Sequence, residues 1–340
     1  MSRSDRFLKA CRGEPVDTTP VWIMRQAGRY MKEYRDVREK YTFLEVCHIP
    51  EVACEVTLQP LDRLNVDAAI LFSDIMIPLE GMGCKVDFNP GPVMEPIRTR
   101  ADVDALRVCN PEEDVPFVLD AVKLIRKELG GKVPLIGFSG APFTLAAYMV
   151  EGKGSREFAN FKRMMFGAPD LFNDLMEKVS DTVIAYLNAQ AKAGAQALQI
   201  FDTWGGILSP ADYKKYVLPH SKRIIDSLDK SVPVINFVKG SGLMLDHVKE
   251  VGGDVIGLDW HIDIERAIKE LGPDFAVQGN MDPSYMFAPV ELAKKTAAEI
   301  TEKGKKAKGH IFNLGHGIMP MADVETARAV VEAVHEAGAR

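Results

Sequence analysis

The sequence lacks the features that mark several large classes of protein. It has no apolar run of about 18 residues, the length needed to span a bilayer, and its start, MSRSDRFLKACRG, has no apolar signal-peptide core. We therefore expect no membrane association and a cytoplasmic location. The net charge is −6, so no overall positive field attracts nucleic acid, and we expect no nucleic-acid partner.

Cysteine is also scarce, and its spacing is uninformative. The five cysteines lie in the first third of the chain, at Cys11, Cys47, Cys54, Cys84 and Cys109. None belongs to a CxxC pair, and the chain has no HExxH motif, so the sequence does not predict a structural or catalytic zinc site. We interpret the cysteines as reduced structural thiols and expect no bound metal.

Eight short apolar runs, each ending in polar or glycine residues, recur along the chain. They are Val21–Gln26, Ala68–Asp74, Pro134–Gly140, Ala197–Thr203, Pro233–Val238, Val255–Trp260, Phe275–Asn280 and Ile311–Gly317. Their nearly continuous hydrophobicity is typical of strands buried on both faces of a parallel sheet. An open, doubly wound sheet would use the same alternation, but it normally carries a phosphate-binding glycine fingerprint after its first strand, and none is present.

Amphipathic stretches follow most of these runs and predict the covering helices. They are Val115–Leu129, Asp170–Ala193, Ala211–Leu228, Leu243–Val251, Ile264–Leu271, Val290–Glu302 and Val324–Ala337. No low-complexity tract or Pro/Gly/Ser linker divides the chain, and residues 81–96 form a turn-rich excursion. The pattern predicts one α/β domain over residues 1–340, a (β/α)8 barrel of TIM type with inserted loops at its mouth.

Polar side chains gather at the carboxyl ends of the predicted strands, where the loops of such a barrel build an active site. The first strand runs into Arg25 and Arg29, whose guanidinium groups suit carboxylates, while Gly28 permits close backbone approach. The alternative is a pair of structural salt bridges at a helix start.

Asp74 closes the second apolar strand. A carboxylate at such a place is costly unless backbone donors or a ligand complete it. A turn or helix cap is the alternative function of this residue.

Three further polar residues give weaker signals when each is taken alone. Tyr148 lies about two turns into the helix after the third strand, Thr203 precedes paired glycines, and His316 stands between two glycines. A core tyrosine, a turn hydroxyl and a structurally bonded histidine are the alternatives. The cluster Gly152-Lys-Gly-Ser155 lacks the spacing of a phosphate-binding loop, and we do not interpret it as one.

Taken together, the stretches RGEPVDTTPVWIMRQAGRY, LFSDI, GFSGAPFTLAAYM, QIFDTWGG and FNLGHGI resemble the signature blocks of the uroporphyrinogen decarboxylase family. The resemblance implies a distorted (β/α)8 barrel, a homodimer, and conversion of the four acetate side chains of uroporphyrinogen III to methyl groups, giving coproporphyrinogen III. It implies no metal and no organic cofactor.

The same resemblance assigns roles to individual residues. Arg25 and Arg29, with the backbone of Gln26, Ala27 and Gly28, would bind substrate carboxylates, and Phe43 would line the same cleft. Asp74 would accept hydrogen bonds from the pyrrole N–H groups, and Tyr148, Thr203 and His316 would be the remaining polar contacts. Many relatives have serine in place of Thr203, so its methyl group puts the fit of this contact in question.

Decarboxylation leaves an electron pair on carbon, and a ring-protonated pyrrole of the substrate would accept it. We expect Asp74 to stay ionised and to stabilise this cation. Arg25 is the candidate proton donor that the family suggests; its high intrinsic pKa keeps a solvent or substrate-carboxyl route open.

Two other functions compete with this hypothesis. A zinc-dependent corrinoid methyltransferase of the same superfamily would need late cysteine ligands, whereas this chain has no cysteine after Cys109. A non-catalytic tetrapyrrole carrier would keep the arginines without needing Asp74.

Overall fold

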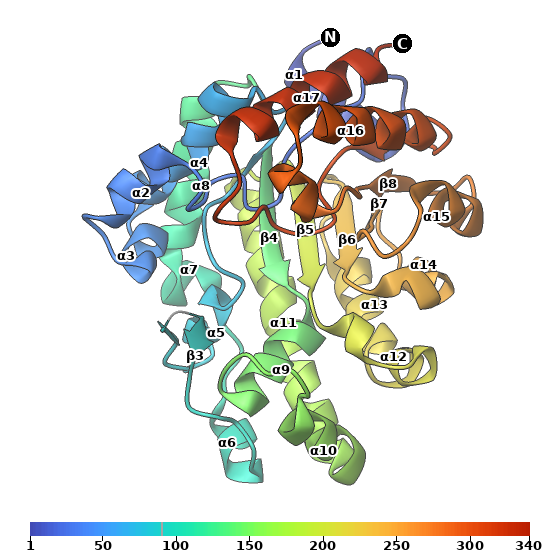
Figure 1. Ribbon diagram of the computed structural model, residues 1–340. Coiled ribbons are helices and arrows are strands. Elements are labelled where there is room, and N and C mark those ends of the chain that lie inside the picture. The colour runs from blue at the N-terminus through green and yellow to red at the C-terminus, as the bar shows by residue number, and fades with distance from the viewer. Residues whose placement is uncertain (90) are drawn as a thin grey trace.

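A parallel sheet of seven strands organises the computed structural model, which describes residues 1–89 and 91–340 (Figure 1). In spatial order the strands are β1 (Ala69–Ile70), β4 (Leu135–Gly140), β5 (Ala197–Asp202), β6 (Val234–Val238), β7 (Val255–Gly257), β8 (Ala276–Gln278) and β9 (His310–Ile311). Every neighbouring pair is parallel. The order in space follows the order along the chain, as repeated β–α units dictate.

The segment around Val21 closes this sheet into a ring. Val21 forms a parallel bridge with Phe312, the Trp22 N–H donates to the Phe312 carbonyl at 3.3 Å, and the Phe312 N–H donates to that of Pro20 at 2.8 Å. On the other side, the Asp67 N–H donates to the Val21 carbonyl at 2.7 Å, just before β1. The predicted (β/α)8 barrel is therefore confirmed, but its first predicted strand forms only one β-bridge, between Val21 and Phe312.

The prediction of a strand from Val21 to Gln26 is wrong beyond its first residues. Arg25 has a φ of 64°, in the left-handed region that ends an extended strand, and the Gln26 N–H donates to the Ile23 carbonyl at 2.8 Å. The chain thus turns sharply where the mouth begins, and Arg25 lies on that turn.

Helices cover the outer face of the barrel, and six of the seven predicted stretches contain one main helix. These are α8 (Pro116–Leu129), α11 (Pro169–Ala193), α14 (Leu245–Val251), α15 (Ile264–Leu271), α16 (Val290–Gly304) and α17 (Val324–Gly338). The seventh divides into α12 (Pro210–Tyr216) and α13 (Leu218–Ser227). The reason is Pro219, which has no N–H to continue a helix and disfavours helical geometry in the preceding residue.

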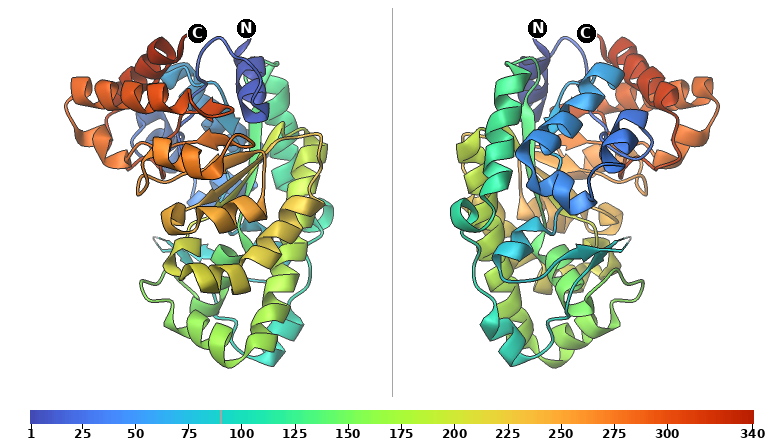
Figure 2. Two further views of the ribbon diagram at one scale, coloured as in Figure 1. Left: turned by 90° about the vertical axis from the view of Figure 1, so that its right-hand side faces the viewer. Right: turned by 90° about the vertical axis from the view of Figure 1, so that its left-hand side faces the viewer.

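Further helices belong to the inserted segments and the N-terminal region. They are α1 (Arg3–Arg12), α2 (Lys32–Arg38), α3 (Phe43–His48), α4 (Pro50–Leu64), α5 (Ile77–Gly81), α6 (Arg100–Ala105), α7 (Pro111–Asp114), α9 (Pro142–Glu151) and α10 (Ala159–Gly167), with short 3-10 turns η1 (Gly205–Ile207), η2 (Ser241–Leu243) and η3 (Pro283–Phe287). The excursion at 81–96 contains the antiparallel pair β2 (Asp87–Phe88) and β3 (Pro92–Val93). In Figures 1 and 2, α6, α9 and α10 extend past the carboxyl ends of the strands, away from the two termini.

A buried carboxylate joins three segments at the terminal end of the barrel. Asp67 is fully buried and accepts hydrogen bonds from Arg6 Nη1 at 2.7 Å and the Val21 N–H at 2.8 Å, while His335 Nε2 lies 2.6 Å from its Oδ2. Arg6 belongs to α1, Val21 to the segment that bridges to Phe312, and His335 to α17. This cluster connects the N-terminal helix α1 and the C-terminal helix α17 to the amino-terminal end of β1.

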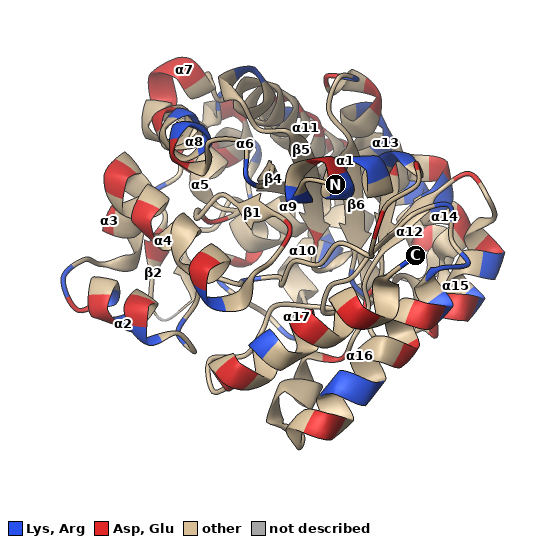
Figure 3. Ribbon diagram, turned by 90° about the horizontal axis from the view of Figure 1, so that it is seen from above, with Lys and Arg blue, Asp and Glu red and all other residues tan. Residues whose placement is uncertain are grey.

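The outer surface mixes charges of both signs. Figure 3 shows acidic and basic residues interspersed along the helices seen from the terminal end. Among the described residues, no helix is both long enough and apolar enough to cross a membrane.

Candidate active site

The structure places the predicted catalytic carboxylate, Asp74, in the turn between β1 and α5. Asp74 Oδ1 accepts the Met76 N–H at 2.9 Å and its carbonyl accepts the Ile77 N–H at 3.2 Å, so the turn-cap alternative is part of its role. Among the described residues, no side chain donates a hydrogen bond to it. The carboxylate therefore keeps most of its hydrogen-bonding capacity for a ligand.

Arg25 lies close enough to Asp74 for its positive charge to lower the pKa of that carboxyl group. Burial raises the pKa of Asp74 to about 6, and the Met76 N–H and the charge of Arg25 only partly oppose this rise. Desolvation thus outweighs the charge of Arg25, and the expectation that Asp74 stays ionised depends on the pyrrole N–H donors of the substrate. A ligand that donates hydrogen bonds would shift the balance toward the ionised form.

His316 also lies near Arg25. A Cβ at Gly317 would overlap the Arg25 side chain, and a Cβ at Gly315 would overlap the Trp260 backbone. The two glycines thus allow the loop to bring His316 beside Arg25, which explains the GHG pattern. The His316 ring is parallel to that of Phe237, with ring centroids 6.4 Å apart. Its Nδ1 is buried without a hydrogen-bond partner among the described residues.

His316 is uncharged at neutral pH. Burial, helped by the positive charges of Arg25 and Lys239, lowers its pKa to about 3. A neutral imidazole with an unpartnered nitrogen in the described part of the chain is suited to a directional hydrogen bond with a ligand rather than to charge attraction.

Internal hydrogen bonds hold the segment that follows Arg25. Gln26 is buried, with its Oε1 accepting the Ile23 N–H at 3.2 Å and its Nε2 donating to the Ala68 carbonyl at 3.1 Å. Its carbonyl accepts the Tyr30 hydroxyl at 2.6 Å. These bonds fix the loop that carries Ala27 and Gly28, both partly buried. A Cβ at Gly28 would lie 3.1 Å from the Arg25 carbonyl, so a larger residue would crowd this turn.

Phe43 belongs to a cluster of aromatic rings with Tyr34, Phe72 and Phe88. Phe43 packs against Phe72 and Phe88 with ring centroids 5.9 and 4.6 Å apart, and Phe72 lies 5.6 Å from Tyr34. Arg29 is exposed, and its charge reaches Tyr34. The guanidinium group that lies over this cluster is that of Arg38, 5.6 Å from the Phe43 ring centroid.

Tyr148 is carried by α9, the helix that follows β4. Its ring meets Trp204 edge-on with centroids 6.1 Å apart. Burial raises its pKa; Asp74 adds to the rise and Arg25 opposes it, so these three residues share one electrostatic neighbourhood.

Asp202 connects two sequence motifs, one of which carries Tyr148 and the other Thr203. Its Oδ1 accepts hydrogen bonds from the Thr144 hydroxyl at 2.7 Å and from the Gly205 N–H at 3.0 Å. The Thr144 hydroxyl oxygen in turn accepts the backbone N–H of Trp204 at 3.1 Å. Burial raises the pKa of Asp202 to about 6. This cluster links GFSGAPFT on β4–α9 to FDTWGG on β5–η1 and sets the position of Thr203.

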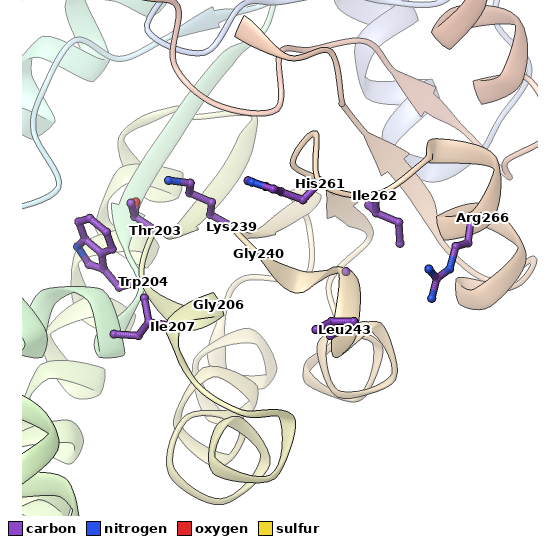
Figure 4. Close-up of a pocket in the computed structure, with 11 residues that line it drawn as sticks. Thr203, Trp204, Gly206, Ile207, Lys239, Gly240, Leu243, His261, Ile262 and Arg266 are labelled. Atoms are coloured by element: carbon purple, nitrogen blue, oxygen red, sulfur yellow. The ribbon is translucent and has the colours of Figure 1, made fainter. Parts of the chain in front are cut away.

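Thr203 opens onto a cavity of about 500 Å³ beyond the end of β5 (Figure 4). Its lining residues are Thr203, Trp204, Gly206, Ile207, Lys239, Gly240, Gly242, Leu243, His261, Ile262 and Arg266. Asp74, Arg25, Tyr148 and His316 are not among them. Lys239 connects the two regions, because it lines the cavity and its charge acts on His316.

Three residues that the structure places at the mouth are missed by sequence reasoning. Lys239 and Asp202 stand at predicted strand ends without an assigned role, and Trp204 appears only as part of a motif. Aromatic residues directly after strands are the available signal for Trp204 and Trp260. Among the described residues, no group of three or more His, Cys, Asp or Glu side chains is placed to hold a metal ion.

Comparisons with known proteins agree with the geometry. The model of the family described as Uroporphyrinogen decarboxylase (URO-D) matches residues 2–337. A protein named uroporphyrinogen decarboxylase from Geobacter sulfurreducens is 60% identical over 334 residues, which make up 98% of each chain. Another of that name, from Trichlorobacter lovleyi, is 59% identical over 339 residues, covering 99% of this chain and 100% of the relative.

Among solved structures, a methyltransferase from Methanosarcina mazei superposes with a TM-score of 0.84 and covers 99% of both chains at 22% identity. At that identity the likeness concerns the barrel and not the reaction. The family match over residues 2–337 and the relatives at about 60% identity lead to one conclusion: this chain belongs to the uroporphyrinogen decarboxylase family.

Proposed function

We propose that this protein removes the four acetate carboxyl groups of uroporphyrinogen III as carbon dioxide and releases coproporphyrinogen III. The observation that carries the proposal is the Asp74 carboxylate, which lies at the barrel mouth within the field of Arg25 and accepts the Met76 N–H. Its remaining acceptor sites suit the convergent N–H groups of a cyclic tetrapyrrole.

The chemistry follows from that carboxylate. A proton added to a pyrrole carbon gives a cationic ring, and the electrons of the breaking C–CO2 bond flow into it as carbon dioxide departs. A second proton on the exocyclic carbon completes the methyl group, and loss of the first proton from the ring carbon restores the aromatic pyrrole. An ionised Asp74 beneath the ring stabilises the cation electrostatically. The pyrrole N–H donors would lower the pKa of Asp74 from about 6, so that substrate binding itself favours the charged form.

The substrate's carboxylates would bind to the cationic side of the mouth. Arg25 and Arg29 supply guanidinium groups, and neutral His316 supplies a hydrogen-bonding nitrogen. Phe43, with its neighbouring rings, would face the macrocycle, and Tyr148 and Thr203 would contact it from α9 and the end of β5. Arg25 is the proposed proton donor, with water and a substrate carboxyl group as competing routes.

We further propose that residues 1–340 act as one domain, as a cytoplasmic homodimer, without a metal or organic cofactor. Support for one domain is a core cluster that joins Phe7 in α1 to Val334 in α17. Support for the dimer is the family resemblance, and sedimentation analysis tests it. Support for cofactor independence is the substrate's own pyrrole ring, which supplies the electron sink.

Anaerobic incubation with uroporphyrinogen III, followed by separation of the products by carboxyl count, tests the proposal. We expect products with seven to four carboxyl groups. Binding without loss of carboxyl groups would favour a tetrapyrrole carrier. Turnover that needs added zinc and a methylcorrinoid would favour a methyltransferase.

A further inference from the structure

A further cation, Lys239, lies at the mouth apart from the loop that carries Arg25 and Arg29. Lys239 follows β6, where its N–H donates to the Asp202 carbonyl at 3.0 Å. A Cβ at Gly206 would overlap the Lys239 carbonyl oxygen, so the second glycine of FDTWGG lets the two loops touch. The backbone of Lys239 is thus fixed by the neighbouring strand end.

The side chain of Lys239 is held between two indole rings. Its Nζ lies 6.0 Å from the ring centroid of Trp204 and 5.7 Å from that of Trp260. Such contacts hold an ammonium group in place without neutralising it. Figure 4 shows Lys239 between Thr203 and His261, well away from Arg266.

The charge of Lys239 has no acidic partner among the described residues. Asp259, the carboxylate that closes the neighbouring strand end, is fully buried and accepts the Gly240 N–H at 2.8 Å, while His261 Nδ1 lies 2.7 Å from it. Arg266, the other cation of the cavity, is paired with Glu270 at 2.7 Å. Lys239 is therefore a half-buried ammonium whose donors are available to a ligand, facing a cavity and the His316 ring.

We propose that Lys239 binds a carboxylate of the substrate on the side of the mouth away from Arg25 and Arg29, with the Thr203 hydroxyl beside it. The inference rests on the proposed function, because a substrate with carboxylates around a ring needs cations on more than one side. Lys239 is then a binding and orienting residue, and the indoles that hold it limit the directions in which the ring can enter.

Steady-state kinetics of Lys239→Met, which keeps the apolar stem and removes the charge, tests this role. We expect the KM for uroporphyrinogen to rise about tenfold, with kcat within about threefold of wild type and a smaller dependence of KM on salt. Lys239→Arg should restore most of the affinity. The matched control is Lys249→Met, because Lys249 is also half-buried over an aromatic ring, Phe275 at 6.0 Å, but lies on α14 outside the mouth.

A binding measurement separates this inference from the proposed reaction. Anaerobic equilibrium dialysis of uroporphyrinogen against Asp74→Asn, with and without Lys239→Met, gives Kd without turnover, and we expect about a tenfold difference. Loss of turnover in wild type would overturn the proposed reaction only. A Kd and KM within about twofold of the parent in a folded Lys239→Met protein would overturn the role of Lys239, as would an equal change in Lys249→Met.

Discussion

Two carboxylates at opposite ends of the same strand have opposite surroundings. Asp67 precedes β1 and is satisfied by Arg6, the Val21 N–H and His335. Asp74 follows β1, and within the described part of the chain its carboxylate receives only the Met76 N–H. The hydrogen bonds of Asp67 therefore join segments at the amino-terminal end of the barrel strands. Asp74 keeps free acceptor sites, and burial raises its pKa to about 6.

The difference separates a group that stabilises the fold from one kept for a ligand. A buried charge with several donors holds segments together, whereas a buried charge with few donors destabilises the protein until a ligand completes it. Comparing the effects of the same substitution at both positions tests this separation.

The largest effect is expected on stability at Asp67. Asp67→Asn leaves the Arg6 guanidinium without its buried partner, so the free energy of unfolding should fall by about 3–5 kcal/mol. Urea denaturation measures this. Asp17→Asn is the control, because Asp17 also pairs with Arg6 but is partly exposed, and its loss should cost about 1 kcal/mol.

Next in size is the effect of Asp74→Asn on turnover. The amide keeps the shape but removes the negative charge, so kcat should fall by about 2–4 kcal/mol in transition-state stabilisation, roughly 30- to 1000-fold. Anaerobic product analysis measures it. Wild-type rates in a folded variant would refute the role of Asp74.

The same variant should be more stable than wild type. The folded-state pKa of Asp74 is about 6 against an ordinary 3.8, so ionising it in the folded protein costs stability above pH 6, by up to about 3 kcal/mol. The neutral amide of Asp74→Asn avoids that cost. The gain in Tm should be full near pH 8, shrink as the pH falls from about 6 to about 4, and vanish below; a loss of stability at pH 8 would contradict it.

The pH profile of the wild type should reflect the same group. As the pH falls below about 6, free Asp74 takes up a proton, and kcat/KM should drop about tenfold per pH unit. The acid limb of kcat should lie at lower pH, since bound pyrrole N–H groups stabilise the ionised form. An acid limb that persists unchanged in Asp74→Asn would assign it to another residue.

The smallest effect is expected at Arg29. Arg29→Lys keeps the charge but not the bidentate fork, so KM should rise about fivefold with little change in kcat. Arg35→Lys is a nearby control, since Arg35 donates to the carbonyls of Arg29 and Tyr30 rather than to the mouth. An unchanged KM in Arg29→Lys would argue against carboxylate binding there.

The sequence predicted the barrel because its parallel strands are buried on both faces and read as apolar runs. It could not predict that the first run would contribute a single bridge, since Val21 to Gln26 is equally apolar until the left-handed turn at Arg25. The break in the predicted helix over residues 211–228 was readable from Pro219.

The site was predictable only where motif and position agreed. Strand ends indicated Arg25 and Asp74, but the pKa of Asp74 depends on how completely the fold removes water, which spacing does not specify. Lys239 also stands at a strand end, but its position alone assigned it no role, because that role depends on two indoles from different loops, Trp204 and Trp260.

The bridge between Val21 and Phe312 also bears on how the chain is made. Val21 and Trp22 leave the ribosome early, whereas Phe312, with which they pair, is synthesised far later. The ring cannot close before Phe312 has been synthesised, so the nascent chain exposes an unpaired sheet edge, a feature that favours association between chains.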